Sequence, residues 1–331
     1  TPSNSSAASD VYKRQAWWYA DHSFGNQDLE KWTSCSEIRH VLETKDHVTI
    51  CVESKERTWE LMIYPVVGGF RMIAGKKGFF DGKPEAFSME ESEHAYIIRS
   101  KEHEMILQKE TLEISIDRKA ITNLKNISFI FEKESVSASR IQFSIHENSA
   151  IYGFGERFDS VNQYGKTVAL WQRDACEGCL ASIGNQAYKN IPLVHTSDGF
   201  SFFANTSYRM RMDVGDAVQD YLSVEALGDV FDFYIWSGTP REAMTAYGTL
   251  TGLPIFPPEW VFEPWAGGGG GRWRNGPLQD IALEQMAAMK KFHELDIPHS
   301  GFYAEGAGAT FYGEYKKEEL YKVVSFGERH G

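Results

Sequence analysis

Apolar and polar side chains alternate along the chain from Trp32 to about Trp236. Because successive side chains of a β-strand point to opposite faces of its sheet, this period of two predicts strands with one buried face. Turn-forming runs such as Ser197-Asp198-Gly199 separate the segments, and strong helical periodicity is absent. The pattern predicts a β-sandwich. The clearest alternating sets are Val48, Ile50 and Val52; Leu112, Ile114 and Ile116; and Phe231, Phe233 and Ile235.

The pattern changes after the proline-rich residues 251–258, where neither a helix nor a central strand can continue. Beyond them, apolar residues spaced by three and four, from Leu278 to Phe292, predict a helix with Pro277 in its first turn. Strand, helix, strand and helix in this order form a βαβα unit, which is typical of a parallel sheet. The four predicted elements cover residues 259–265, 278–295, 299–304 and 316–326.

Composition narrows the class of protein. The chain has 331 residues, of which 42% are hydrophobic and 24% charged, so disorder is excluded as its main state. Lys and Arg number 34 against 46 Asp and Glu, and the net charge of −12 argues against nucleic acid or an anionic membrane as a partner. No stretch approaches the roughly 18 consecutive apolar residues of a membrane span.

Neither a metal nor an organic cofactor is predicted. Cys35 and Cys51 stand alone, and the close pair Cys176 and Cys179 lacks the second pair that a zinc ribbon needs. The glycine run 267–271 fits neither the dinucleotide-binding nor the Walker pattern. It is either a flexible strand-to-helix loop, the alternative we favour, or a place where backbone approaches a ligand closely.

An ordered series of short motifs lies between Ile151 and Gly215, and taken together it resembles glycoside hydrolase family 31, the α-glucosidase and α-xylosidase group. A later segment, Tyr247 to Gly252 followed by Pro257-Pro258-Glu259-Trp260, is similar to the family's junction into its catalytic barrel. The resemblance covers about residues 32–331. It implies a galactose-mutarotase-like β-sandwich followed by the first βαβα part of a (β/α)8 barrel. The series comprises Tyr152-Gly153-Phe154-Gly155-Glu156-Arg157-Phe158-Asp159-Ser160, Asn162-Gln163-Tyr164-Gly165-Lys166, Trp171-Gln172-Arg173-Asp174, Ile191-Pro192-Leu193, Ser197-Asp198-Gly199-Phe200, Phe203-Ala204-Asn205 and Asp213-Val214-Gly215.

The resemblance also implies substrate-binding residues. In the family an Arg-Asp element on a sandwich loop contributes an Asp to the sugar site, and Arg173-Asp174 matches it; without the family, Asp174 would be taken for an ordinary loop acid. Glu305 stands where the family has an Asp at the end of the second barrel strand, which leaves the preferred sugar open. Trp265 is either a stacking platform for a sugar or a core residue.

We expect the catalytic carboxylates to be missing from this chain. A β/α barrel takes about 250 residues, and the 75 residues from Pro257 onward hold two strands and two helices. The family cleaves with retention through carboxylates that follow the fourth and sixth barrel strands, so no residue of this chain is assigned as nucleophile or acid/base. The expected segments are a non-native leader over 1–15, a β-sandwich over 16–245 and the start of a barrel over 246–331.

The sequence therefore predicts the N-terminal part of a retaining α-glycosidase that acts on α-glucosides or α-xylosides, inactive as it stands and needing no cofactor. The alternative is a carbohydrate-binding or scaffold sandwich without chemistry, although such a protein has no use for a βαβα tail. A mutarotase-like isomerase would need a His and acid pair inside the sandwich, and none is evident from the sequence.

Overall fold

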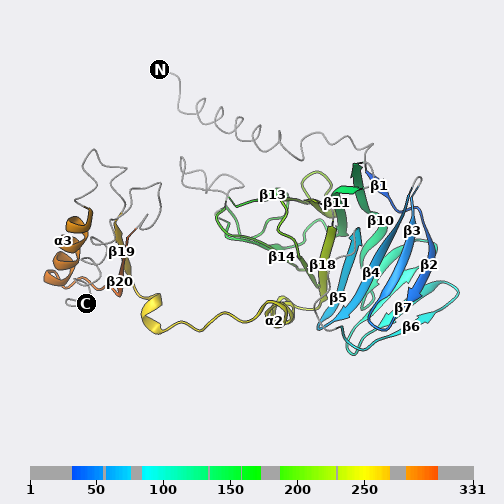
Figure 1. Cartoon of the computed structure of the whole chain (residues 1–331), viewed down its shortest axis with the longest axis horizontal. Coiled ribbons are helices and arrows are strands. Elements are labelled where there is room, and N and C mark those ends of the chain that lie inside the picture. The colour runs from blue at the N-terminus through cyan, green and yellow to red at the C-terminus, as the bar shows by residue number, and fades with distance from the viewer. Residues whose placement is uncertain are drawn as a thin grey trace, which may run out of the picture. The chain divides into compact units, whose positions relative to one another are not determined.

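The computed structural model describes residues 32–54, 57–75, 84–132, 135–157, 159–172, 187–228, 230–268 and 281–304. The chain divides into two compact units, Thr1–Gly252 and Leu253–Gly331. The first unit contains two large antiparallel sheets, and the second contains a parallel pair of strands with a helix between them in sequence (Figure 1).

The larger sheet of the first unit has ten strands. These are β1 (Thr33–Ser34), β6 (Ser88–Glu91), β7 (Ala95–Arg99), β8 (Glu104–Gln108), β9 (Glu113–Ile116), β10 (Lys119–Glu132), β11 (Ser135–Ser144), β13 (Lys166–Leu170), β16 (Met210–Val214) and β17 (Tyr221–Leu227). Their order is β13-β16-β17-β11-β10-β9-β8-β7-β6, with β1 beside β10.

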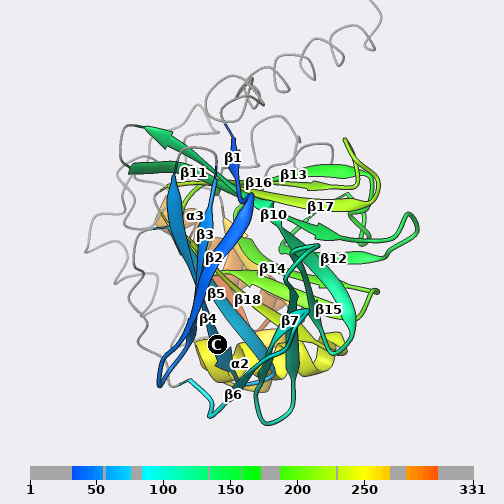
Figure 2. The same cartoon turned by 90° about the vertical axis from the view of Figure 1, so that its right-hand side faces the viewer.

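The other sheet has eight strands. These are β2 (Glu37–Glu43), β3 (Val48–Glu53), β4 (Thr58–Val66), β5 (Gly69–Gly75), β12 (Ile151–Gly155), β14 (Asn190–Thr196), β15 (Phe200–Ala204) and β18 (Val230–Ser237). Their order is β12-β14-β15-β18-β5-β4-β3-β2, and both sheets are visible in Figure 2.

The inner faces of the two sheets form the main hydrophobic core. Each alternating set that the sequence singled out contributes its apolar members to this one cluster, from Val48 in β3 to Phe231 in β18. Phe143 of the larger sheet stacks on Phe202 of the smaller one, with ring centroids 4.8 Å apart. The predicted β-sandwich is therefore confirmed, and its strands point the predicted side chains inward.

The outer face of the eight-stranded sheet is also buried over part of its area. Strands β4 and β18 place alternate residues in the core and the residues between them in a second cluster, which includes Tyr64 and Trp236. Helix α2 (Pro240–Thr251) covers this second cluster with Ala243 and Ala246, and appears as the yellow helix in Figure 2. Its Tyr247 ring lies edge-on to Phe203 of β15, at 5.2 Å.

The sequence analysis did not predict α2, although the chain carries its start signal. The Thr239 hydroxyl accepts a hydrogen bond from the Glu242 amide, and the Glu242 carboxylate accepts one from the Thr239 amide. This reciprocal capping box, with Pro240 in the first turn, fixes where the helix begins. The domain boundary expected after residue 245 stays a prediction; α2 spans that position.

The second unit corrects two expectations about residues 259–271. The predicted strand over 259–265 is instead a 3-10 turn, η3 (Glu259–Phe262), and strand β19 (Trp265–Gly268) begins only after Pro264. Pro258 and Pro264 lack the amide that a strand ladder needs, which confines the strand to the residues beyond them. The loop predicted over the glycine run 267–271 begins later than predicted, because Gly267 and Gly268 belong to β19 and pair with residues of the next strand.

The rest of the second unit follows the predicted strand–helix–strand order where it is described. Helix α3 (Ile281–Glu294) lies between β19 and β20 (Gly301–Ala304), and the two strands pair in parallel. The helix predicted over 316–326 falls outside the described residues. In the part of the chain that the structure describes, no helix has both the length and the apolar character needed to cross a bilayer.

Candidate functional site

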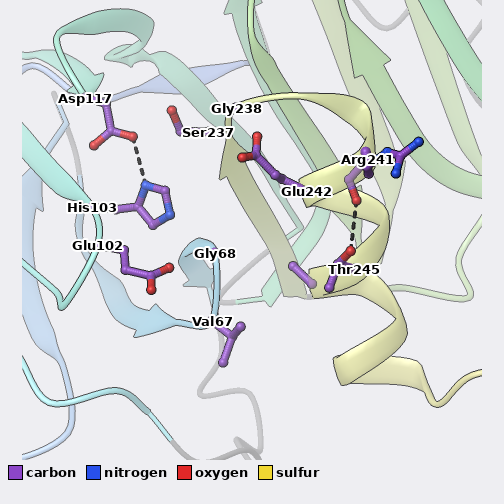
Figure 3. A pocket seen from close by; sticks show the side chains of 11 residues that line it. Val67, Gly68, Glu102, His103, Asp117, Ser237, Gly238, Arg241, Glu242 and Thr245 are labelled. Carbon is purple, nitrogen blue, oxygen red and sulfur yellow. Dashed lines mark hydrogen bonds and ion pairs between the residues drawn. The ribbon is translucent and has the colours of Figure 1, made fainter.

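A cleft of about 450 Å³ opens at the end of the sandwich where the two sheets meet the first turn of α2. The β4–β5 turn, the β7–β8 loop, the β9–β10 turn and the end of β18 form its walls (Figure 3). Its lining residues include acidic and basic side chains. The lining residues are Val67, Gly68, Glu102, His103, Asp117, Ser237, Gly238, Arg241, Glu242, Thr245 and Ala246.

His103 and Asp117 form a hydrogen-bonded pair in this cleft. The Nδ1 atom of His103 lies 2.8 Å from Oδ2 of Asp117, and Figure 3 shows the other ring nitrogen turned toward the cleft. Asp117 and Arg118 occupy the β9–β10 turn with φ of 50° and 66°, a conformation that directs the carboxylate back toward His103. No His and acid pair was evident from the sequence; the structure shows this one between the β7–β8 loop and the β9–β10 turn.

Two carboxylates of the cleft, those of Asp117 and Glu242, accept hydrogen bonds from neighbouring backbone amides. Burial would raise the pKa of Asp117, but hydrogen bonds from His103, the Glu104 amide and the Ser237 hydroxyl outweigh it and hold the pKa below its usual value. The Thr239 amide and hydroxyl lower the pKa of Glu242, with a smaller contribution from His103. Asp117 and Glu242 are therefore held as carboxylates by groups of a turn and of the α2 cap.

A second polar cluster surrounds the gap between β13 and β14, where the predicted Arg173-Asp174 element belongs. Arg157 directs Nη2 to the Ala169 carbonyl oxygen at 3.0 Å and to Oδ1 of Asn190 at 2.6 Å. Asn190 in turn donates from Nδ2 to the Ala187 carbonyl oxygen at 3.1 Å. Ala187 and Gln172 form an isolated parallel bridge. We call Arg157, Ala169, Gln172, Ala187 and Asn190 the loop-base cluster.

The strand that carries Arg157 into this cluster is irregular. Its residue Phe154 is buried yet has a φ of 68°, and the glycines on either side have φ of 117° and 87°. The pairing of β12 with β14 shifts between Gly153 and Gly155, opposite Pro192. A Cβ at Gly155 would lie 2.1 Å from the Lys189 carbonyl oxygen, so the close approach of the two strands requires glycine there.

Asp159 lies just beyond Arg157 and is strongly stabilised as a carboxylate. It accepts hydrogen bonds from the Lys166 ammonium at 2.6 Å and from Gln163 at 3.0 Å. Burial opposes ionisation, but these bonds and one from the Ser160 amide lower the pKa of Asp159 to about 2. The segment between β12 and β13 is thereby fixed by a charged anchor at its start.

Of the predicted site residues, the structure describes Trp265. Arg173, Asp174 and Glu305 lie outside the described residues, as do Cys176 and Cys179 of the close cysteine pair. Trp265 is the first residue of β19, and its ring packs against Gly301. The centroid of the ring lies 5.5 Å from that of Trp260, and Nε1 of Trp265 donates a hydrogen bond to the Val261 carbonyl oxygen at 3.2 Å. Trp265 is 43% exposed, so it is not a buried core residue, and its role as a stacking platform for a sugar stays a prediction.

The sequence analysis missed the loop-base cluster as a functional feature. The glycines around Phe154 signalled an unusual backbone, but strand register, which decides the partners of Arg157, cannot be read from one sequence. Among the residues described, no group of three His, Cys, Asp or Glu side chains is placed so that it could hold a metal ion.

Comparisons with known proteins agree with this architecture. Residues 39–213 match the family described as the glycosyl hydrolase 31 N-terminal galactose mutarotase-like domain. The alpha-xylosidase XylQ of Lactiplantibacillus pentosus is 34% identical over 166 residues, which are 50% of this chain and 21% of that protein. The chain thus spans about a fifth of the length of this curated relative.

Solved structures show the same fold at low identity. The cycloalternan-forming enzyme of Listeria monocytogenes, in complex with a pentasaccharide substrate, has a TM-score of 0.70 at 18% identity; the match covers 82% of this chain and 27% of that one. The family 31 dextranase of Flavobacterium johnsoniae has a TM-score of 0.67 at 19% identity, covering 89% and 37%. With the sandwich, its ordered motifs and the matched domain in agreement, the chain belongs to glycoside hydrolase family 31, and residues 39–213 are its N-terminal galactose mutarotase-like domain.

Proposed function

We propose that this chain is the N-terminal part of a retaining α-glycosidase that hydrolyses α-glucosides or α-xylosides. One observation carries the proposal: the family 31 N-terminal sandwich is followed in the same chain by the parallel unit β19–α3–β20. A free-standing carbohydrate-binding sandwich has no need of such a unit. The relatives named as alpha-xylosidase and alpha-glucosidase support the substrate class.

In the proposed enzyme, Asp174 and Glu305 are each a ligand of sugar hydroxyls. A carboxylate accepts hydrogen bonds from two neighbouring hydroxyls, which suits a vicinal diol. Strand β20 ends at Ala304, so Glu305 follows the carboxyl end of a parallel strand, where β/α barrels build their sites. Arg173, next to Asp174, adds a positive charge. Trp265, which is 43% exposed, is proposed as a stacking platform for a sugar ring.

The proposed reaction proceeds in two steps on carboxylates of the full enzyme. An acid protonates the glycosidic oxygen while a carboxylate attacks the anomeric carbon, so the aglycone leaves and a glycosyl ester forms. The conjugate base of that acid then takes a proton from water, whose oxygen displaces the ester and releases the sugar with retained configuration. Neither a metal nor an organic cofactor is required by this scheme.

The binding role is tested by NMR titration of the 331-residue chain with methyl α-glucoside and methyl α-xyloside. We expect weak binding that Asp174→Asn and Glu305→Gln each reduce several-fold, since each removes a charged acceptor. Asp46→Asn, at an exposed turn of the sandwich, is the matched control and should leave binding unchanged. Binding that none of the three variants alters would refute the assigned site, and a chain that binds neither sugar would refute the proposal for these residues.

A further inference from the structure

The cleft at the end of the sandwich presents a ring nitrogen that no described residue uses. Nδ1 of His103 lies 2.8 Å from Oδ2 of Asp117, and because that carboxylate is held ionised, Nδ1 carries a proton and donates it. The His103 side chain is 16% exposed, and Nε2, which makes no hydrogen bond to a described residue, is turned toward the cleft (Figure 3). A largely buried imidazole is thus held by one edge and offers the other to a ligand.

Glu242 supplies a carboxylate to the same cleft from helix α2. The Thr239 amide and hydroxyl both donate to its Oε2, each at 2.8 Å, and no described residue donates to Oε1. The Thr239 groups, and His103 more weakly, lower the pKa of Glu242, so an ionised carboxylate interacts with the imidazole across the cleft. An imidazole and a carboxylate therefore face one space from two different elements.

Such a pair is suited to moving two protons between neighbouring atoms of a small molecule. In a cyclic reducing sugar, the carbon C1 carries both a hydroxyl and the ring oxygen, and the ring opens when a proton leaves the hydroxyl as another reaches the ring oxygen. The cleft, of about 450 Å³, has the size of a small-molecule site, and the hydroxyls of Ser237 and Thr245 line it beside the apolar Val67. A retaining α-glycosidase releases its sugar in the α form, so the proposed function would supply this substrate.

We propose that this cleft converts the α form of a reducing sugar into the β form, with His103 as the acid and Glu242 as the base. Glu242 takes the proton of the C1 hydroxyl while Nε2 of the imidazolium gives its proton to the ring oxygen. The bond from C1 to the ring oxygen breaks, its electron pair stays on that oxygen, and an open-chain aldehyde forms. After rotation about C1–C2, the same oxygen attacks the other face of C1, and both protons return to the groups that held them. The activity goes beyond the proposed function and does not involve Asp174 or Glu305.

Asp117 is a positioning residue in this scheme. Its two oxygens hold Nδ1 of His103 and the Glu104 amide, so the ring keeps one orientation, and its charge stabilises the imidazolium that acts as the acid. Asp117→Asn keeps a side chain that tolerates the left-handed backbone of this turn, where φ is 50°. It should lower kcat for the conversion and leave KM unchanged, whereas a raised KM with unchanged kcat would overturn the assignment.

Polarimetry of freshly dissolved α-glucose and α-xylose tests the activity of the 331-residue chain. The chain should speed the change in optical rotation in proportion to its concentration, and the rate should saturate with sugar. Imidazoles and carboxylates anywhere on a protein catalyse this reaction weakly, so a chain no faster than its His103→Gln variant would overturn the proposal. Because the assay starts from free sugar, it can fail while the proposed function holds, and the reverse.

Two variants and a matched control identify the cleft as the site. His103→Gln and Glu242→Gln should each lower the protein-dependent rate roughly 10²-fold or more, the usual contribution of one general acid or base. Glutamine also completes a capping box, so Glu242→Gln keeps the start of α2 and carries the test if His103→Gln fails to fold. His94→Gln removes a histidine whose side chain is 75% exposed and should leave the rate unchanged. An equal loss in His94→Gln would show non-specific catalysis and overturn the site.

Discussion

Arg71 of β5 and Asp232 of β18, 161 residues apart in sequence, form an ion pair on the outer face of the eight-stranded sheet. Nε of Arg71 donates to Oδ1 of Asp232 at 2.7 Å, Nη2 donates to Oδ2, and Asn205 donates to the same carboxylate oxygen at 2.9 Å. Arg71 is 2% exposed and Asp232 8%, so the pair is largely shielded from water. The Arg71 guanidinium also lies over the ring of Tyr234, a member of the second hydrophobic cluster, 5.1 Å from its centroid.

Removing one partner of this pair should destabilise the sandwich strongly. Arg71→Met leaves a buried carboxylate without its cation, and the free energy of unfolding should fall by about 3–5 kcal/mol. Urea denaturation followed by tryptophan fluorescence measures it. The double variant Arg71→Met with Asp232→Leu should regain much of the loss, because no charge is then buried; a double variant as unstable as the single one would contradict this account.

The Asp159–Lys166 pair should make stability depend on pH in the acid range. Folding lowers the pKa of Asp159 to about 2 from a usual value near 3.8. The stabilisation that the ionised carboxylate gives to the folded state is therefore complete above pH 3.8 and is lost as the pH falls through 2. Asp159→Asn should therefore lower stability by about 1 kcal/mol at pH 6, allowing for solvent screening, and by nothing once the pH is well below the folded-state pKa. Thermal denaturation of both proteins across this range checks the convergence, and a constant difference would refute it.

The capping box of α2 gives a more modest prediction. Thr239→Ala removes the side-chain acceptor of the Glu242 amide and should cost about 1 kcal/mol of stability. Thr249→Ala, in the exposed interior of the same helix, should be neutral or slightly stabilising because alanine has the higher helix propensity. Equal effects of the two substitutions in urea denaturation would rule out the cap as the cause.

The close approach of β12 to β14 predicts that two glycines differ sharply in tolerance. Gly165 has a φ of 77° but open space around its Cβ position, so Gly165→Ala should cost only about 1–2 kcal/mol of backbone strain. Gly155→Ala adds a clash with the Lys189 carbonyl and should cost about 1–3 kcal/mol more. Denaturation midpoints of the two variants provide the comparison, and similar midpoints would argue against the close contact.

The 331-residue chain should not turn over any α-glycoside. By the family resemblance, the nucleophile and the acid/base follow barrel strands beyond the unit β19–α3–β20, and without a nucleophile no glycosyl ester forms. Assays with aryl α-glucoside, α-xyloside and α-galactoside, together with mass spectrometry for a glycosylated protein, check this. Turnover above the rate in buffer would require catalytic carboxylates within the 331 residues of the chain itself.

The sequence predicted the faces of the sandwich well because one physical rule governs them. Residues such as Val48 and Phe231 alternate with polar neighbours, and burial of one face enforces that period. Tyr234 and Trp236 break the rule, since α2 buries their side of the sheet as well. Helix α2 itself was not predicted, although the spacing of Thr239 and Glu242 indicates the start of a helix.

The site was less accessible to sequence reasoning than the fold. Motif order pointed to Asp174, but the contacts of Arg157 depend on which residues of β13 and β14 lie beside it. The register of β12 and β14 shifts where Phe154 lies opposite residues 191–193 of β14, and a one-residue slip would have given different partners. The pair of His103 and Asp117 was missed for a similar reason, since a turn conformation rather than a spacing joins them.

The packing of α2 on the sandwich has a consequence for how this domain can be cut or exchanged between proteins. A polypeptide ending at residue 245 would lose Ala246 and Tyr247 and would expose the aromatic surface around Trp236 to solvent. An exposed apolar patch of this kind promotes self-association of the protein. We therefore expect crossovers that recombine this sandwich with foreign partners to be tolerated only beyond Gly252, where the first compact unit ends.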